Sequence, residues 1–165
     1  MNIYVDFDHT LFNTTLFIKE IKKLIKEDFR KPNIKELEKV IKENKIDLKK
    51  YLYPDTLLFL SKYSSNNLIL LTRGNLDYQL FKIKESKIEN YFKNIIVVNQ
   101  YKGLLNLDYK NSIFIDDNPK EIESILKNNP KKVIRLKRGK YKDILLTNST
   151  IEYESLLDIN LKKDR

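Results

Sequence analysis

The chain has 165 residues, with 32 Lys and Arg against 23 Asp and Glu, which gives a net charge of +9 at pH 7. A chain of this length has room for one domain with a full hydrophobic core. The absence of cysteine excludes disulfides and thiolate catalysis, and the single histidine, His9, excludes a multi-histidine metal centre. No apolar run approaches the roughly 18 residues of a membrane span, and the first residues do not resemble a signal peptide, so we expect a soluble cytoplasmic protein.

The positive charge has two interpretations. A basic surface attracts phosphate groups, nucleic acid or anionic membranes. The chain also has no alanine and is crowded with Lys, Asn, Ile and Leu, a compositional bias that an AT-rich genome would produce. We attribute most of the excess charge to this bias and expect no membrane partner.

Short runs of branched and aromatic residues predict buried strands. They alternate with helical segments, which predicts an α/β fold with a Rossmann-like parallel sheet of about five strands flanked by helices. In chain order, the predicted strands lie at residues 2–5, 68–71, 95–98, 113–115 and 133–136.

The predicted helices lie between these strands and have recognisable ends. Pro32 ends the first helix, because proline cannot continue a helical hydrogen-bond ladder. Asn33 with Glu36 forms a capping box at the start of the second. In chain order, the helices are expected at residues 17–29, 34–41, 54–63 and 76–83, from residue 118 onwards, and around residues 155–157.

The stretch from residue 13 to residue 53 is helical only and interrupts the alternation. It carries 12 Lys and Arg against 7 Asp and Glu. We interpret it as a small α-helical insertion between the first strand and its crossover helix. The predicted domains are therefore a core of residues 1–12 and 54–165 and an inserted segment of residues 13–53.

Acidic side chains follow two of the predicted strands. In a parallel sheet the carboxyl ends of all strands lie at one edge, and ligands bind there. Two carboxylate pairs at one edge would repel each other without a cation between them, and carboxylate oxygens suit Mg²⁺. Strand-end aspartates also cap helices, but capping requires no such convergence. The sequence therefore predicts a magnesium site formed by Asp6, Asp8, Asp116 and Asp117.

These motifs resemble those of the haloacid dehalogenase superfamily, specifically its phosphatase branch. The first motif, Asp-x-Asp-x-Thr after a strand, is residues 6–10, and the second, a strand that ends in Thr, is at Thr72. The third is a lysine, here Lys102 with Lys110 as the alternative, and the fourth is the acidic pair 116–117. All four motifs occur in the family's order.

The resemblance implies a Mg²⁺-dependent phosphatase that hydrolyses a phosphomonoester through an aspartyl-phosphate. Asp6 would be the nucleophile, and Asp8 would protonate the leaving oxygen and then activate water. Thr72 and Lys102 would bind the phosphate. Arg73, beside Thr72, is a further candidate for phosphate binding, with a solvated arginine as the alternative. Dehalogenases of this fold lack an acid at the position of Asp8, so its presence favours phosphoryl transfer; a phosphomutase would in addition need a cap that excludes water.

The resemblance also suggests how the magnesium ligands are shared. Asp6 and Asp116 would hold the ion together with the backbone carbonyl of Asp8, and Asp117 would assist the metal shell or orient the lysine. The family usually has glycine where His9 stands, and we expect His9 to be a turn residue, with a substrate-facing proton donor as the alternative.

The family places a helical cap where residues 13–53 lie, so a lid over the site is expected, with an ordinary helical bundle as the alternative. Residues 127–142 contain eight Lys and Arg and no acid. They would position a nucleotide or nucleic acid at the catalytic edge, with Tyr141 as a stacking face, or they are simply solvated. The expected partner is a phosphorylated metabolite or nucleotide. The alternatives are a polynucleotide end phosphatase and a non-catalytic nucleic-acid-binding module.

Overall fold

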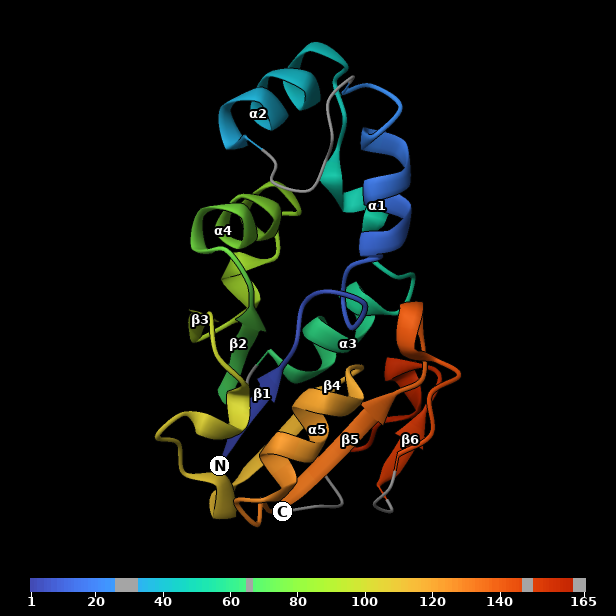
Figure 1. Ribbon diagram of the computed structural model, residues 1–165. Helices are drawn as coiled ribbons and strands as arrows, with labels where there is room; N and C mark the ends of the chain where they lie inside the picture. The colour runs from blue at the N-terminus through green and yellow to red at the C-terminus, as the bar shows by residue number, and fades with distance from the viewer. Residues whose placement is uncertain (26–32, 65–66, 147–149, 162–165) are drawn as a thin grey trace.

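A computed structural model describes residues 1–25, 33–64, 67–146 and 150–161 (Figure 1). Its centre is a six-stranded sheet in which all neighbouring strands are parallel, in the order β3-β2-β1-β4-β5-β6. The predicted Rossmann-like α/β fold is therefore confirmed. The strands are β1 (Asn2–Val5), β2 (Asn67–Arg73), β3 (Asn94–Val98), β4 (Ser112–Asp116), β5 (Lys132–Leu136) and β6 (Ile151–Tyr153).

Five strands are predicted from the sequence, and the structure adds the sixth, β6. It pairs with β5, where Leu136 lies opposite Tyr153. Its three residues are exposed or half-buried, so they lack the apolar run that marks the buried strands. The helix expected around residues 155–157 is a short 3₁₀ helix, Leu156–Asp158.

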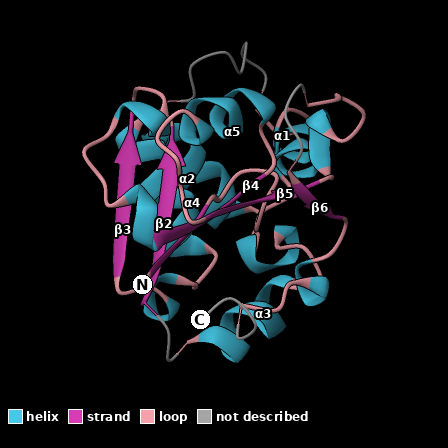
Figure 2. Ribbon diagram, turned by 90° about the horizontal axis from the view of Figure 1, so that it is seen from below, coloured by secondary structure: helices cyan, strands magenta, loops and turns pink. Residues whose placement is uncertain are grey.

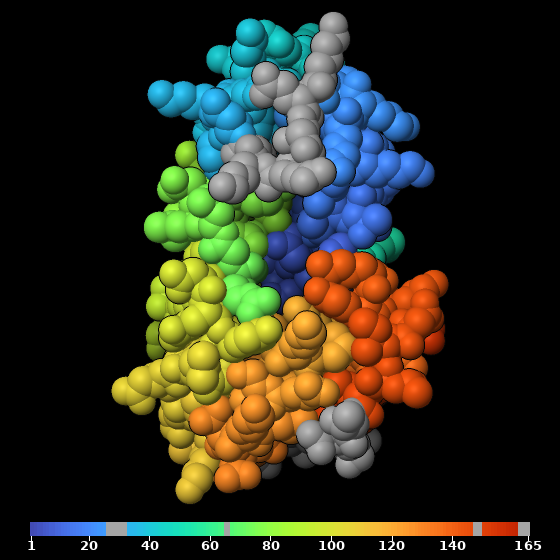
Figure 3. Space-filling model, in the orientation of Figure 1, coloured from blue at the N-terminus to red at the C-terminus, as the bar shows by residue number. Residues whose placement is uncertain are grey.

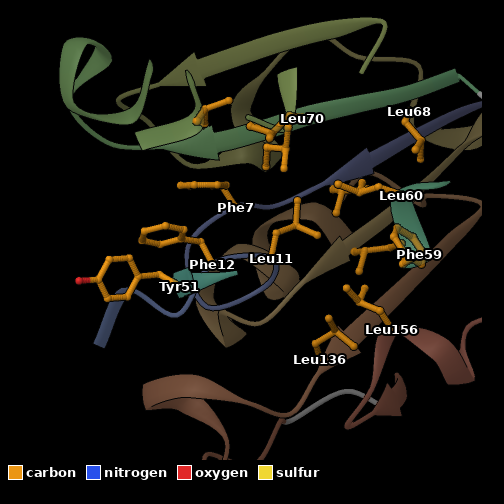
Figure 4. Packing of buried hydrophobic residues seen from close by; sticks show 14 of the residues in the cluster. Phe7, Leu11, Phe12, Tyr51, Phe59, Leu60, Leu68, Leu70, Leu136 and Leu156 are labelled. Atoms are coloured by element: carbon orange, nitrogen blue, oxygen red, sulfur yellow. The ribbon is translucent and has the colours of Figure 1, made fainter. Parts of the chain in front are cut away.

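Helices cover both faces of the sheet. Alternate residues of each strand point to opposite faces, so Ile3 packs in one hydrophobic layer with Phe59, while Tyr4 packs in the other with Ile122. Figure 2 shows α3 and α5, which carry these two partners, on opposite sides of the strands. Figure 4 shows the larger layer, on the α3 side. The described α-helices are α1 (Thr14–Ile21), α2 (Ile34–Glu43), α3 (Thr56–Tyr63), α4 (Leu76–Glu85) and α5 (Pro119–Leu126).

Most of the predicted helix starts are confirmed. The Asn33 side chain accepts a hydrogen bond from the backbone of Lys35 at the start of α2. α1 ends at Ile21, earlier than expected, and the predicted end at Pro32 lies outside the described residues. α3 begins after Asp55, which makes no capping hydrogen bond because its carboxylate binds a distant arginine described below.

The helices α1 and α2, which come between β1 and α3 in the chain, lie beyond the carboxyl ends of the strands, at the top of Figure 1. Aromatic contacts anchor described parts of this segment. Phe17 of α1 and Tyr51 of the 3₁₀ helix Leu48–Tyr51 lie with their ring centroids 5.4 Å and 5.8 Å from that of Phe12. All three rings belong to the larger hydrophobic layer. The division into a core and an inserted segment stays a prediction.

Among the described residues, none of the helices combines the length and the apolar character needed to traverse a lipid bilayer.

Candidate active site

A cavity of about 190 Å³ lies at the carboxyl ends of the central strands. Figure 3 shows a hollow here, with the first residues of the chain (dark blue) at its floor and green, amber and orange-red segments around it. The structure thus brings together the side chains of all four sequence motifs. All seven predicted site residues line the cavity: Asp6, Asp8, Thr72, Arg73, Lys102, Asp116 and Asp117.

A tight turn after β1 presents the first motif to the cavity. The Phe7 carbonyl accepts hydrogen bonds from the backbone of Leu11 at 2.9 Å and of Phe12 at 3.0 Å. His9 has a φ of 62°, in the left-handed region, which confirms the prediction that it is a turn residue. Gly139, with φ of 66°, packs so closely on this turn that a Cβ there would lie 2.6 Å from the His9 Cβ.

Lys102 bridges the acidic residues of β1 and β4. Its Nζ donates to Asp6 Oδ1 at 2.5 Å and to Asp116 Oδ2 at 2.6 Å. Burial opposes the ammonium charge, but these two carboxylates outweigh it and raise the pKa of Lys102. Its backbone N–H donates to Glu121 of α5 at 2.9 Å, which fixes the chain at this point. Of the two predicted lysines, Lys102 reaches the acids, whereas Lys110 is exposed and does not line the cavity.

Three buried carboxylates form a group that fits a divalent cation. Asp6, Asp116 and Asp117 each offer one oxygen, and these oxygens lie within 4.8 Å of one another. Asp117 Oδ2 is buried and has no hydrogen-bond partner among the described residues. Burial, with the charges of Asp6 and Asp116, raises the pKa of Asp117 to about 9. Burial also raises the pKa of Asp6 to about 7, against the opposing charge of Lys102. One ammonium thus leaves the carboxylates undercompensated, and the oxygen donors suit Mg²⁺.

The Asp8 carboxylate is engaged elsewhere, by three donors that we call the Asp8 clamp: Thr14, Gln79 and Lys82. Asp8 Oδ1 accepts from Lys82 Nζ at 2.5 Å and from the Thr14 hydroxyl, and Oδ2 accepts from Gln79 Nε2 at 2.7 Å. Burial by itself would raise the pKa of Asp8, but the Lys82 charge and these hydrogen bonds lower it below its ordinary value. The carboxylate lies outside the three-acid group, so a magnesium ligand from Asp8 would have to be its backbone carbonyl.

The clamp residues were not among the predicted site residues. Gln79 and Lys82 lie on α4. Two apolar residues of this helix, Leu76 and Leu80, are 55% and 41% exposed, whereas Gln79 and Lys82 are buried. The available signal was the three-residue spacing of Gln79 and Lys82, which places both on the helix face that also buries Ile83.

Two of the three predicted phosphate-binding residues, Thr72 and Arg73, lie at the end of β2. Thr72 is fully buried, and its hydroxyl has no hydrogen-bond partner among the described residues. The guanidinium of Arg73 lies 2.9 Å from a Glu121 oxygen and 4.3 Å from the centre of the Tyr101 ring. The Thr72 hydroxyl is therefore available to a bound anion, and Arg73 is held beside it.

The basic segment 127–142 is less available than its charge suggests. Arg135 is buried and pairs with Glu152 at 2.7 Å. Arg138 binds the carboxylate at the start of α3. Lys140 lines the cavity. The predicted contact with substrate is therefore limited to the end of the segment, where Lys140 and Tyr141 line the cavity.

No protein-family model matches the sequence, and no curated protein matches it. Solved structures do match. A haloacid dehalogenase-like hydrolase from Burkholderia xenovorans aligns with a TM-score of 0.68 and 12% identity, over 93% of this chain and 92% of that chain. The HAD-hydrolase YfnB from Bacillus subtilis, bound to magnesium, aligns with a TM-score of 0.62 and 11% identity, over 94% and 95%.

A third structure is the L-2-haloacid dehalogenase from Xanthobacter autotrophicus with chloropropionic acid covalently bound, with a TM-score of 0.63 and 12% identity over 94% of each chain. Identities this low define a shared fold, whereas function has to be argued from the site itself. The architecture, the strand-end acids and these three alignments lead to the same conclusion: the chain has the fold of the haloacid dehalogenase-like hydrolases.

Proposed function

We propose that the protein is a Mg²⁺-dependent phosphatase that hydrolyses a small phosphomonoester through an aspartyl-phosphate on Asp6. One observation carries the proposal. Asp6 and Asp8, two residues apart, line the same cavity as Lys102 and the three-acid group. The hydrolases that share the fold support a hydrolytic reaction.

Asp6 and Asp8 would have different roles in the reaction, Asp6 as the nucleophile and Asp8 in proton transfer. An Asp6 oxygen would attack phosphorus, forming the aspartyl-phosphate as the bond from phosphorus to the ester oxygen breaks. The negative charge of a bound phosphate opposes ionisation of Asp8, so Asp8 would take up a proton in the substrate complex and then give it to that departing oxygen. Asp8 would then take a proton from water, whose oxygen attacks phosphorus and releases inorganic phosphate and free Asp6.

The groups around the two aspartates would stabilise the negative charge of the phosphate. Lys102 would stabilise the charge on the phosphoryl oxygens, and the unpartnered Thr72 hydroxyl would donate a hydrogen bond to one of them. Asp6, Asp116 and Asp117 are the side chains that would hold Mg²⁺, which when bound supplies positive charge against the repulsion between carboxylate and phosphate.

Asp8 separates this reaction from halide displacement. Chloride leaves as a stable anion and needs no proton, whereas the alkoxide of a phosphomonoester does. An acid side chain in the cavity, two residues after the nucleophile, therefore favours phosphoryl transfer. The cavity of about 190 Å³ favours a small substrate, and the pairing of Arg135 and Arg138 within the fold weakens the alternative of a polynucleotide.

The test is hydrolysis of p-nitrophenyl phosphate by the purified protein with Mg²⁺. We expect Asp6→Asn to lose activity by about a thousandfold or more, because the amide cannot attack phosphorus. Asp77→Asn, at an exposed carboxyl on α4, should keep full activity. EDTA should abolish turnover, and added Mg²⁺ should restore it. Turnover that persists in Asp6→Asn or that ignores EDTA would contradict the proposal.

A further inference from the structure

The Asp8 clamp occupies one oxygen of the carboxylate and leaves the other partly open. An ionised carboxylate has about four acceptor positions, two on each oxygen. Lys82 and Thr14 take both positions on Oδ1, and Gln79 takes one on Oδ2. Among the described residues, no further donor to Asp8 is present. One acceptor position, on Oδ2, is left to exchange a proton with a substrate.

Lys82 is buried in a way that a merely structural lysine does not require. Its side chain is fully buried, and its Nζ lies 4.6 Å from the centre of the Tyr78 ring and 5.2 Å from that of Phe7. Burying an ammonium group costs several kcal/mol unless a carboxylate compensates it. Within the described chain, Asp8 is the carboxylate at ion-pair distance from Lys82. The position of Lys82 is therefore explained by Asp8, whose side chain is 24% exposed at the cavity.

Gln79 connects the clamp to the phosphate-binding residues. Its Nε2 donates to Asp8 Oδ2 and also to the backbone carbonyl of Arg73 at 3.1 Å. Arg73 follows Thr72 at the end of β2. The orientation of the Asp8 carboxylate is thus set relative to the strand end that would hold the phosphate.

We propose that Lys82 and Gln79 are positioning residues that hold Asp8 so that its Oδ2 exchanges the proton, first with the leaving oxygen and then with water. This inference rests on the proposed phosphatase function. Holding a reacting group in its productive orientation removes the cost of ordering it in the transition state. Lys82 and Gln79 act through Asp8 and need not touch the substrate.

The first experiment uses two substrates of similar size and different leaving group. kcat/KM is measured for p-nitrophenyl phosphate, whose phenolate leaves readily, and for phenyl phosphate, whose leaving oxygen depends more on a proton. We expect Lys82→Met to lower kcat/KM for phenyl phosphate by about 10- to 100-fold, part of the usual contribution of general acid catalysis. The loss for p-nitrophenyl phosphate should be several-fold smaller. Lys84→Met, at an exposed position on the same helix, should change neither.

The second experiment combines Lys82→Met with Asp8→Asn. If Lys82 acts through Asp8, the substitution has no further effect on kcat once Asp8 has lost its carboxyl group, within about twofold. A role confined to stability would lower kcat in the Asp8→Asn background as well. Gln79→Leu provides a second variant with the same expected substrate dependence, should Lys82→Met fail to fold by circular dichroism.

Equal losses for both substrates, or a further loss in the Asp8→Asn background, would overturn the inference and leave the phosphatase proposal intact. Absence of any Asp6-dependent turnover in the unsubstituted protein would overturn the phosphatase proposal itself. A selective loss on phenyl phosphate that disappears in Asp8→Asn supports the positioning role.

Discussion

Asp117 shows how much a single side chain in this site is shaped by its surroundings. It is 2% exposed, and one of its oxygens has no hydrogen-bond partner among the described residues. Its two acidic neighbours, Asp6 and Asp116, add to the effect of burial, so its carboxyl group loses a proton far less readily than in water. Asp117 therefore opposes folding of the metal-free protein at neutral pH, and this cost is consistent with a residue kept to bind a cation.

The resulting prediction concerns Asp117→Asn in the presence of EDTA. The pKa of Asp117 is about 9 in the folded chain against its ordinary value of 3.8, so between these values the carboxyl group is ionised in the unfolded chain and protonated in the folded chain. The folded state binds more protons there, so its stability falls as the pH rises through this window. Asparagine removes that dependence. We expect the Tm of Asp117→Asn minus that of the unsubstituted protein to increase from pH 5 to pH 8.

Thermal melts at several pH values measure this difference. Asp143→Asn, at an exposed carboxyl group, should give a nearly constant difference over the same range. A Tm difference for Asp117→Asn that stays constant with pH would show that the fold does not raise the pKa of the Asp117 carboxyl group.

At the scale of elements, the site depends on how a short 3₁₀ helix, Lys102–Leu104, packs against α5. Gly103 lies so close to α5 that an added Cβ would be 2.1 Å from the backbone oxygen of Ser124. The Gly103 carbonyl also accepts a hydrogen bond at 2.8 Å from Asn128 Nδ2, in the turn that follows α5. This contact sets the direction in which Lys102 enters the cavity.

Gly103→Ala should therefore disturb both stability and activity. The clash is with backbone, which cannot rotate away, so we expect a loss of about 2 kcal/mol in the free energy of unfolding. Displacement of Lys102 should also lower kcat by about tenfold or more. Urea denaturation and p-nitrophenyl phosphate hydrolysis measure the two effects.

Leu104→Ala tests the neighbouring position. Leu104 is 67% exposed, so its truncation should change stability by no more than about 0.5 kcal/mol. Similar effects of the two substitutions would show that the close approach at Gly103 is unimportant.

At the scale of the whole molecule, one buried ion pair joins segments that are far apart in the chain. Arg138 donates to both oxygens of Asp55 at 2.8 Å and 2.9 Å and to the Thr10 carbonyl in the turn after β1. Asp55 also accepts from the Ser155 hydroxyl at 2.9 Å and from the Leu156 backbone at 2.8 Å. The first turn, the start of α3, the loop after β5 and the C-terminal segment thus meet at one carboxylate.

Arg138→Met should destabilise the protein strongly, because it leaves the Asp55 carboxylate buried without its cation. Removal of one partner of such a pair costs about 3 kcal/mol, and both side chains here are only 11% exposed. Lys137→Met breaks the ion pair with Glu152, whose side chains are 36% and 31% exposed, and should cost less than about 1 kcal/mol. Urea denaturation compares the two; equal losses would contradict a special role for the Asp55 contact.

Local sequence patterns were sufficient to predict five of the strands and the residues that lie at their carboxyl ends. An apolar run between turn signals specifies a buried strand wherever it lies, and an acid that follows such a run is carried to the strand end. The first five strands and the convergence of Asp6, Asp116 and Lys102 could therefore be predicted.

The burial of polar side chains depended instead on partners remote in the chain. Lys82 is 74 residues from Asp8, and Arg138 is 83 residues from Asp55. A lysine or arginine is buried only where a distant carboxylate compensates its charge, and no local pattern shows which carboxylate that is. Strand β6 was also not predictable from a local pattern. Its residues are exposed or half-buried, and it forms a strand because it pairs with β5. The inward polar face of α4 and the closure of the molecule around Asp55 were therefore decided by the tertiary structure.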